Sequence, residues 1–187
     1  MLAFQFVFLF FTSLAAKQNG IQIFGPVSPP AWTWAAAAVY VVLIGVSFWR
    51  KFWKATPKQK HKIRVTLPEN PDELWYWIAI SFLAGVTEEY AYRGVAIAAI
   101  YEMTGSLTVA LAICVFAFTV AHVMYGWREV IGIALFALLC HLAVLYTHTL
   151  SLVVAVHVAY DLVLGVLATV AFLRESQRNT AEAQAAV

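Results

Sequence analysis

Charged side chains are scarce in this chain of 187 residues. Only 12% of the residues are Asp, Glu, Lys or Arg, whereas 63% are hydrophobic, and the mean hydropathy is +0.78. A soluble domain has roughly 25% charged residues and about half apolar ones, so the composition excludes an ordinary soluble domain and predicts an integral membrane protein. Cysteine is also rare. Cys114 and Cys140 both fall within apolar runs, where buried free thiols that act as small hydrophobic side chains are expected.

The apolar residues fall into runs whose lengths suit membrane-spanning helices of about 20 residues each. The predicted fold class is therefore all-α, a polytopic transmembrane helix bundle with about six spans in one membrane domain. Two N-terminal spans and a basic loop occupy 1–73, core helices 74–173 and a polar tail 174–187. A polar, turn-rich segment is predicted at 17–30. The predicted spans are 2–16, 31–49, 74–101, 107–124, 130–147 and 150–173.

Basic residues predict the orientation of these spans, because cytoplasmic loops carry an excess of Lys and Arg. Residues 50–64 contain seven of the twelve basic residues and no acid, which predicts a cytoplasmic juxtamembrane loop. Both termini are then cytoplasmic, Lys17 lies outside and Arg93 lies within the membrane. The lipid bilayer is an expected partner of the protein, and no nucleic acid is expected. The basic residues placed inside are Arg50, Lys51, Lys54, Lys58, Lys60, Lys62, Arg64, Arg128, Arg174 and Arg178.

Two adjacent acids and an arginine interrupt the third apolar run, at Glu88, Glu89 and Arg93. Ionised groups at membrane depth cost several kcal/mol each, so they usually face a protein interior or a water-filled cavity. Glu89 and Arg93 are four positions apart with the acid first, which favours an ion pair on one helix face. Glu88 lies about 100° further round the helix and needs a partner from elsewhere. The alternative is that all three residues only hold helices together.

Histidines and a further acid follow in the later spans. His157 and Asp161 are four positions apart, so both project from one face of the last span, where the acid can orient the imidazole. Because unpaired buried charge is costly, Glu88 and Asp161 are expected to find partners among these groups, His122 included. Structural hydrogen bonding between helices is expected of His141, and no role is expected of His148 or His61.

The motifs Glu88-Glu89-x-x-x-Arg93, Phe118-x-x-x-His122 and His157-x-x-x-Asp161 occur in this order on successive predicted helices. Over about 74–172 the chain resembles the CAAX prenyl endopeptidase and bacteriocin-processing (CPBP or Abi) family of intramembrane proteases. The resemblance implies peptide-bond hydrolysis of a membrane-associated or lipidated protein or peptide, in a bacterial or archaeal cell membrane. It implies the following roles: Glu88 and His122 activate a water, His157 and Asp161 stabilise the oxyanion or hold the site, and Glu89 and Arg93 support the scaffold.

The family's last motif ends in Asn or sometimes Asp. An ionised Asp161 only accepts hydrogen bonds, so its expected role is to orient His157 and leave that ring as the donor. Glu88, His122 and His157 are also a plausible catalytic zinc set, although no His-Glu-x-x-His motif occurs. The metal-independent interpretation is favoured, because the adjacent acids would make a strongly acidic but poorly organised metal cage.

Two other classes of function remain open. One is a non-catalytic membrane accessory or immunity protein with the same scaffold, and the other is a small transporter or proton relay. Internal repeats would support a transporter, and the sequence has none.

The predicted site residues do not lie level along straight spans. Counting about 1.5 Å per residue from the predicted span ends places Glu88 and His157 toward the outer half of the membrane and His122 toward the inner half. Tilt of the long third span, a break near Gly85 or different span ends would be needed to bring them level.

Overall fold

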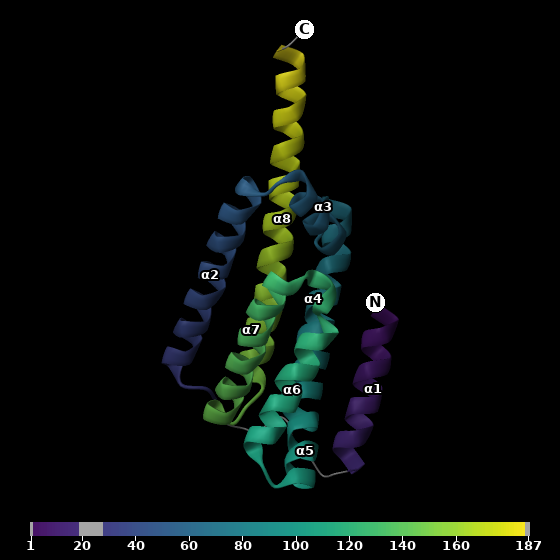
Figure 1. The fold of residues 1–187 in the computed structure, drawn as a ribbon, viewed down its shortest axis with the longest axis vertical. Coiled ribbons are helices and arrows are strands. Elements are labelled where there is room, and N and C mark those ends of the chain that lie inside the picture. The colour runs from purple at the N-terminus through teal and green to yellow at the C-terminus, as the bar shows by residue number, and fades with distance from the viewer. Residues whose placement is uncertain (1, 19–27, 186–187) are drawn as a thin grey trace. The chain divides into compact units, whose positions relative to one another are not determined.

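The computed structural model describes residues 2–18 and 28–185, and within these ranges it contains helices and no strand (Figure 1). This confirms the predicted all-α class. Most of the predicted turn-rich segment, residues 19–27, lies outside the described residues. The helices are α1 (Leu2–Gln18), α2 (Ala31–Lys54), α3 (Pro57–Thr66), α4 (Pro71–Glu89), the π-helix η1 (Tyr90–Ala96), α5 (Ile97–Thr104), α6 (Leu107–Ala121), the 3-10 turn η2 (Val123–Tyr125), α7 (Trp127–Thr147) and α8 (Ser151–Ala185).

Three described helices are long and apolar enough to cross a membrane: Ala31–Lys54, Glu129–Thr147 and Ser151–Ala185. Two shorter apolar helices, Gln5–Ala15 and Leu107–Ala121, accompany them. The apolar helices support an integral membrane protein. The count of six spans and the cytoplasmic placement of both termini stay predictions.

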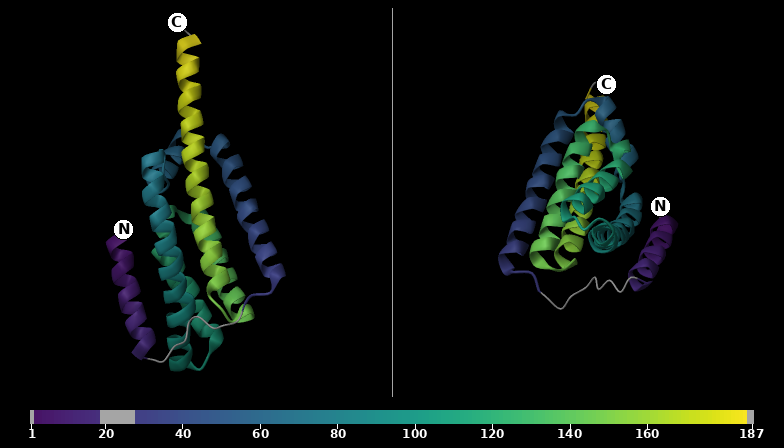
Figure 2. Two further views of the ribbon diagram at one scale, coloured as in Figure 1. Left: turned by 180° about the vertical axis from the view of Figure 1, so that it is seen from behind. Right: turned by 60° about the horizontal axis from the view of Figure 1, so that its bottom comes forward.

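The helices fall into two compact units, each described by itself. The first comprises Met1–Ala35 and Leu83–Ala155, and the second comprises Ala36–Phe82 and Val156–Val187. In the first unit α6 lies beside both α5 and α7, and α1 contacts η1 (Figure 2).

Turn residues set several helix ends. α4 begins at Pro71, and the Asn70 side chain accepts a hydrogen bond from the Glu73 amide at 3.0 Å, so the helix start predicted from this stretch is confirmed. Gly105 ends α5 with a φ of +66°, a left-handed conformation that glycine adopts without steric cost. Ser106 then caps α6, which confirms the predicted turn between these helices.

The prediction that residues 50–64 form a loop was wrong, because two helices occupy this stretch. α2 continues to Lys54, and α3 begins at Pro57 after a break of two residues. Thr56 and Gln59 cap each other's backbone amides, and a proline at the first helical position is preorganised for helix. The sequence Thr56-Pro57-Lys58-Gln59 therefore starts a helix within a stretch whose high positive charge had indicated a loop.

The second unit has an apolar cluster of Phe52, Ala168, Ala171 and Phe172, contributed by α2 and α8. Phe52 and Phe172 meet edge to face, with ring centroids 5.0 Å apart. α3 covers this cluster with basic side chains: Lys60 forms an ion pair with Glu175 on α8 and lies over the Phe52 ring, and Arg64 lies over the Phe172 ring. The basic side chains of α3 therefore contact groups of α2 and α8 in addition to carrying charge.

A close approach of α4 and α8 is built on one glycine in the second unit. A Cβ atom at Gly165 would lie 2.2 Å from Cδ1 of Trp77, so the indole occupies the space that any other side chain would need. The same indole donates a hydrogen bond from Nε1 to the backbone carbonyl of Asp161 at 2.8 Å. Trp77 therefore joins α4 to the turn of α8 that carries Asp161.

Replacing Gly165 by alanine is expected to destabilise the protein by about 1–3 kcal/mol, since the added methyl group displaces the Trp77 ring. Gly132→Ala is the matched control, because a Cβ there meets nothing within 4 Å. Thermal unfolding of the purified variants in detergent measures the difference. Equal melting temperatures of the Gly165→Ala and Gly132→Ala variants would show that the Trp77 ring moves aside without loss of stability.

Candidate active site

The third apolar run changes its helical geometry where its charged residues lie. α4 ends at Glu89, and residues Tyr90–Ala96 form a π-helix before α5 begins. π-Helical segments are rare and occur frequently at functional sites. The α-helix is therefore interrupted at Tyr90, and not near Gly85, the position considered from the sequence.

Glu89 and Arg93 form the expected ion pair. Arg93 Nε lies 3.3 Å from Glu89 Oε2, and both side chains are 0% exposed. The Arg93 guanidinium also lies over the Phe118 ring of α6, with Cζ 4.2 Å from the ring centroid, a cation–π contact. The pair thus links the π-helix to α6 and is closed to solvent.

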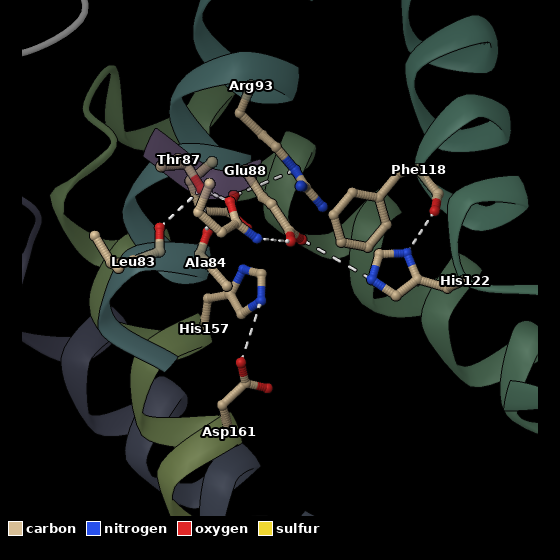
Figure 3. Close-up of polar contacts among 11 residues, drawn as sticks. Leu83, Ala84, Thr87, Glu88, Arg93, Phe118, His122, His157 and Asp161 are labelled. Atoms are coloured by element: carbon tan, nitrogen blue, oxygen red, sulfur yellow. Dashed lines mark hydrogen bonds and ion pairs between the residues drawn. The ribbon is translucent and has the colours of Figure 1, made fainter. Parts of the chain in front are cut away.

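Glu88 turns away from this pair and faces His122 (Figure 3). Its Oε2 lies 3.9 Å from His122 Nε2, and the two side chains are 16% and 24% exposed. His122 Nδ1 lies 2.7 Å from the carbonyl oxygen of Phe118. Because a carbonyl only accepts, Nδ1 carries a proton, and in the neutral ring Nε2 is an acceptor that faces the carboxylate.

Aromatic rings fix the plane of the His122 imidazole. It stacks on Phe118 with centroids 4.6 Å apart, and on Tyr125 with centroids 5.9 Å apart. Tyr92 meets Phe118 edge to face at 5.2 Å. His122 itself ends α6, and Tyr125 closes the 3-10 turn that follows. A short turn after the helix therefore brings Tyr125 back onto the imidazole, a role that the spacing of the motif did not predict.

Two polar residues that the sequence interpretation missed complete the surroundings of Glu88. Gln5 of α1 donates from Nε2 to Glu88 Oε1 at 3.2 Å, and the Thr87 hydroxyl donates to Gln5 Oε1. Gln5 is 5% exposed and Thr87 is fully buried. A signal was present, because Gln5 is the one polar side chain among the apolar residues of 2–11.

The antiparallel turn at Gly105 brings Glu88 and His122 level. The difference in depth found from the sequence arose because each residue was counted from the end of its own predicted span. Both residues lie seventeen positions from Gly105, one before it and one after it. Helices that run in opposite directions from one turn place such positions side by side.

His157 and Asp161 belong to the second unit. His157 Nε2 lies 3.8 Å from Asp161 Oδ2 on the same face of α8, as their spacing predicts. His157 is 6% exposed. The contacts described within units are thus Glu88 with His122, Glu89 with Arg93, and His157 with Asp161; that the first and third pairs share one site stays a prediction.

The other candidates show no catalytic arrangement. His141 is buried, hydrogen bonds through Nδ1 to the Ala137 carbonyl of its own helix at 2.9 Å, and interacts with the backbone of Tyr92 on η1. His148 ends α7 with a φ of +56°. Cys114 and Cys140 are free and buried, as expected. In the described part of the chain no group of three or more His, Cys, Asp or Glu side chains is arranged to hold a metal ion.

The apolar helices define a helical membrane protein in which the carboxylate of Glu88 faces the imidazole of His122. Residues 70–163, half of the chain, match the profile of the family described as Type II CAAX prenyl endopeptidase Rce1-like. The chain therefore belongs to this family, which confirms the resemblance seen in its motifs, and the family and the apolar helices together indicate a membrane-embedded protease of the CAAX endopeptidase type. No curated protein and no solved structure gives a significant match.

Proposed function

We propose that the protein hydrolyses a peptide bond of a membrane-associated or lipidated protein or peptide, with a water activated by Glu88 and His122. The observation that carries this proposal is the placement of two hydrogen-bond acceptors, Glu88 Oε2 and His122 Nε2, 3.9 Å apart. Two acceptors do not bond to each other, but one water has two protons to donate to them. Such a water presents its oxygen lone pairs to a substrate carbonyl.

The reaction then proceeds as acid–base chemistry on Glu88. Its carboxylate takes one proton from the water as the oxygen bonds to the carbonyl carbon. The tetrahedral intermediate collapses with cleavage of the C–N bond, and Glu88 returns the proton to the leaving nitrogen. His122 holds the water at Nε2 through the second proton of that water, since the Nδ1 proton of the ring is donated to the Phe118 carbonyl.

His157 supplies the electrophilic part of the proposed site. Asp161, four positions along the same helix, orients the His157 imidazole. A ring N–H that is already oriented stabilises an oxyanion more strongly in a low-dielectric site than in water. The Trp77 indole, bonded to the Asp161 carbonyl, holds this turn of α8 in place.

Cleavage of a membrane-anchored peptide by the purified protein tests this proposal. A CAAX-type peptide with a prenylated cysteine is the first substrate to offer, because the family is described as prenyl endopeptidases. The same peptide without the prenyl group separates recognition of the lipid from recognition of the peptide. Cleavage of one or both, identified by mass spectrometry, supports a protease. Cleavage of neither, nor of other anchored peptides, would favour the accessory-protein interpretation.

We propose further that this hydrolysis needs no metal ion, since the carboxylate and the imidazole suffice to bind and deprotonate the water. Cleavage is therefore expected to continue at an unchanged rate after dialysis against a strong chelator. Rates before and after dialysis, with the metal content of each sample measured, provide the check. Loss of activity that added Zn²⁺ restores would contradict the proposal and favour zinc held by Glu88, His122 and His157.

A further inference from the structure

Gln5 is a buried amide whose position the proposed chemistry does not explain. It lies on α1, outside residues 70–163 that match the family profile, and it is 5% exposed. A buried amide in an apolar helix is costly unless its donors and acceptor are hydrogen bonded. Gln5 contacts two side chains, Thr87 and Glu88, and both are on α4. The helix therefore places its polar residue directly against the proposed catalytic acid.

The contacts of Gln5 fix one oxygen of the Glu88 carboxylate. Gln5 Nε2 donates to Oε1, whereas Oε2 is the oxygen that faces His122. Without this donor the carboxylate could rotate, and the two oxygens would exchange their surroundings. The amide therefore holds the carboxylate in the orientation in which Oε2 meets the water.

The Thr87 hydroxyl has more acceptors than protons. It lies within hydrogen-bond distance of Gln5 Oε1, of the Leu83 carbonyl at 2.8 Å and of the Ala84 carbonyl at 3.4 Å (Figure 3). A hydroxyl donates one hydrogen bond and accepts two, so it donates to one of these at a time. Its proton can therefore serve either the Gln5 side chain or the preceding turn of α4.

The Thr87 hydroxyl sets which end of the Gln5 amide faces Glu88. With the hydroxyl donating to Gln5 Oε1, the Nε2 end of the amide is the one that meets the carboxylate, and it donates to Glu88 Oε1.

The geometry points to Gln5 as a positioning residue for Glu88, with Thr87 as the group that sets the direction of its amide. This inference rests on the proposed role of Glu88 as general base. It adds α1 to the parts of the protein that serve the proposed site: the first helix holds the Glu88 carboxylate with one oxygen bonded to Gln5 and the other facing His122.

Substitution of Gln5 by methionine, which has similar length and no amide, tests this inference. We expect kcat to fall about 10- to 100-fold, as for loss of a hydrogen bond to a charged group, with KM within about twofold because Gln5 contacts no substrate group in the proposed site. Thr12→Val is the matched control, a buried polar residue two turns along the same helix. It is expected to keep the wild-type kcat. An unchanged kcat in Gln5→Met would overturn the inference.

Thr87 provides a second test that keeps the packing of α1. Thr87→Val preserves the shape and removes the hydroxyl, so kcat is expected to fall, whereas Thr87→Ser keeps the hydroxyl and should restore most of the rate. Equal rates in the valine and serine variants would contradict the inference, even if Gln5→Met failed to fold. Glu88→Gln in the same assay separates the two levels. Full cleavage by Glu88→Gln would refute the proposed function, whereas its loss together with full activity of Gln5→Met would refute only the role of Gln5.

Discussion

The Glu88→Gln variant is expected to lose cleavage, with kcat reduced by about 10²- to 10⁴-fold, the range typical of a general base. Glutamine has the size of glutamate, and its amide oxygen can still accept the hydrogen bond from Gln5. An amide cannot take a proton from water, so binding and packing are preserved while the chemistry stops. Initial rates of peptide cleavage, with the amount and melting temperature of each purified variant, measure the effect.

The control for this substitution is Glu102→Gln, which changes an exposed glutamate on α5 of the same unit. It should cleave at the wild-type rate, so the assay distinguishes the loss of a particular carboxylate from the loss of one negative charge. A Glu88→Gln protein that folds and cleaves normally would remove Glu88 from the reaction. A variant that fails to accumulate would instead assign Glu88 to the scaffold.

The local pairs of the site could be predicted from the sequence because each depends on helical spacing alone. Glu89 and Arg93 meet at four positions apart, as do His157 and Asp161. The partner of Glu88 was harder to find, since His122 lies on another helix. Measuring both residues from their shared turn at Gly105, rather than from span ends assumed to match a bilayer, would have shown that they are level.

Other parts of the site depend on three-dimensional packing that the pattern does not contain. Gln5 and Glu88 are 83 positions apart, and helical periodicity gives no indication of which helix covers Glu88. The π-helix at Tyr90–Ala96 was not predictable either, because no proline marks its start at Tyr90 and its one glycine, Gly94, comes four residues later. The helix α3 could have been predicted from its capping residues, Thr56 and Gln59, but its many basic residues favoured a loop.

The second large effect is expected at the buried ion pair. Substituting Arg93 by methionine would leave the Glu89 carboxylate without its cation in a site that is 0% exposed. Breaking a buried pair by removing one partner costs about 3–5 kcal/mol, because the remaining charge is desolvated without compensation. The variant also loses the contact of the guanidinium with Phe118, on which the His122 ring stacks. We expect a strongly lowered melting temperature and little protein in the membrane.

The double substitution Glu89→Leu with Arg93→Met decides whether the pair serves stability or chemistry. Replacing both charges by apolar groups of similar volume is often neutral, so the double variant is expected to recover most of the lost stability. It should also recover cleavage, because Glu88 and His122 keep their own contacts with Gln5 and with the Phe118 carbonyl. A double variant that melts like the wild type but does not cleave would place the pair in the reaction. The charges of Glu89 and Arg93 would then act on the reaction through their electric field at Glu88, and not only by holding the helices together.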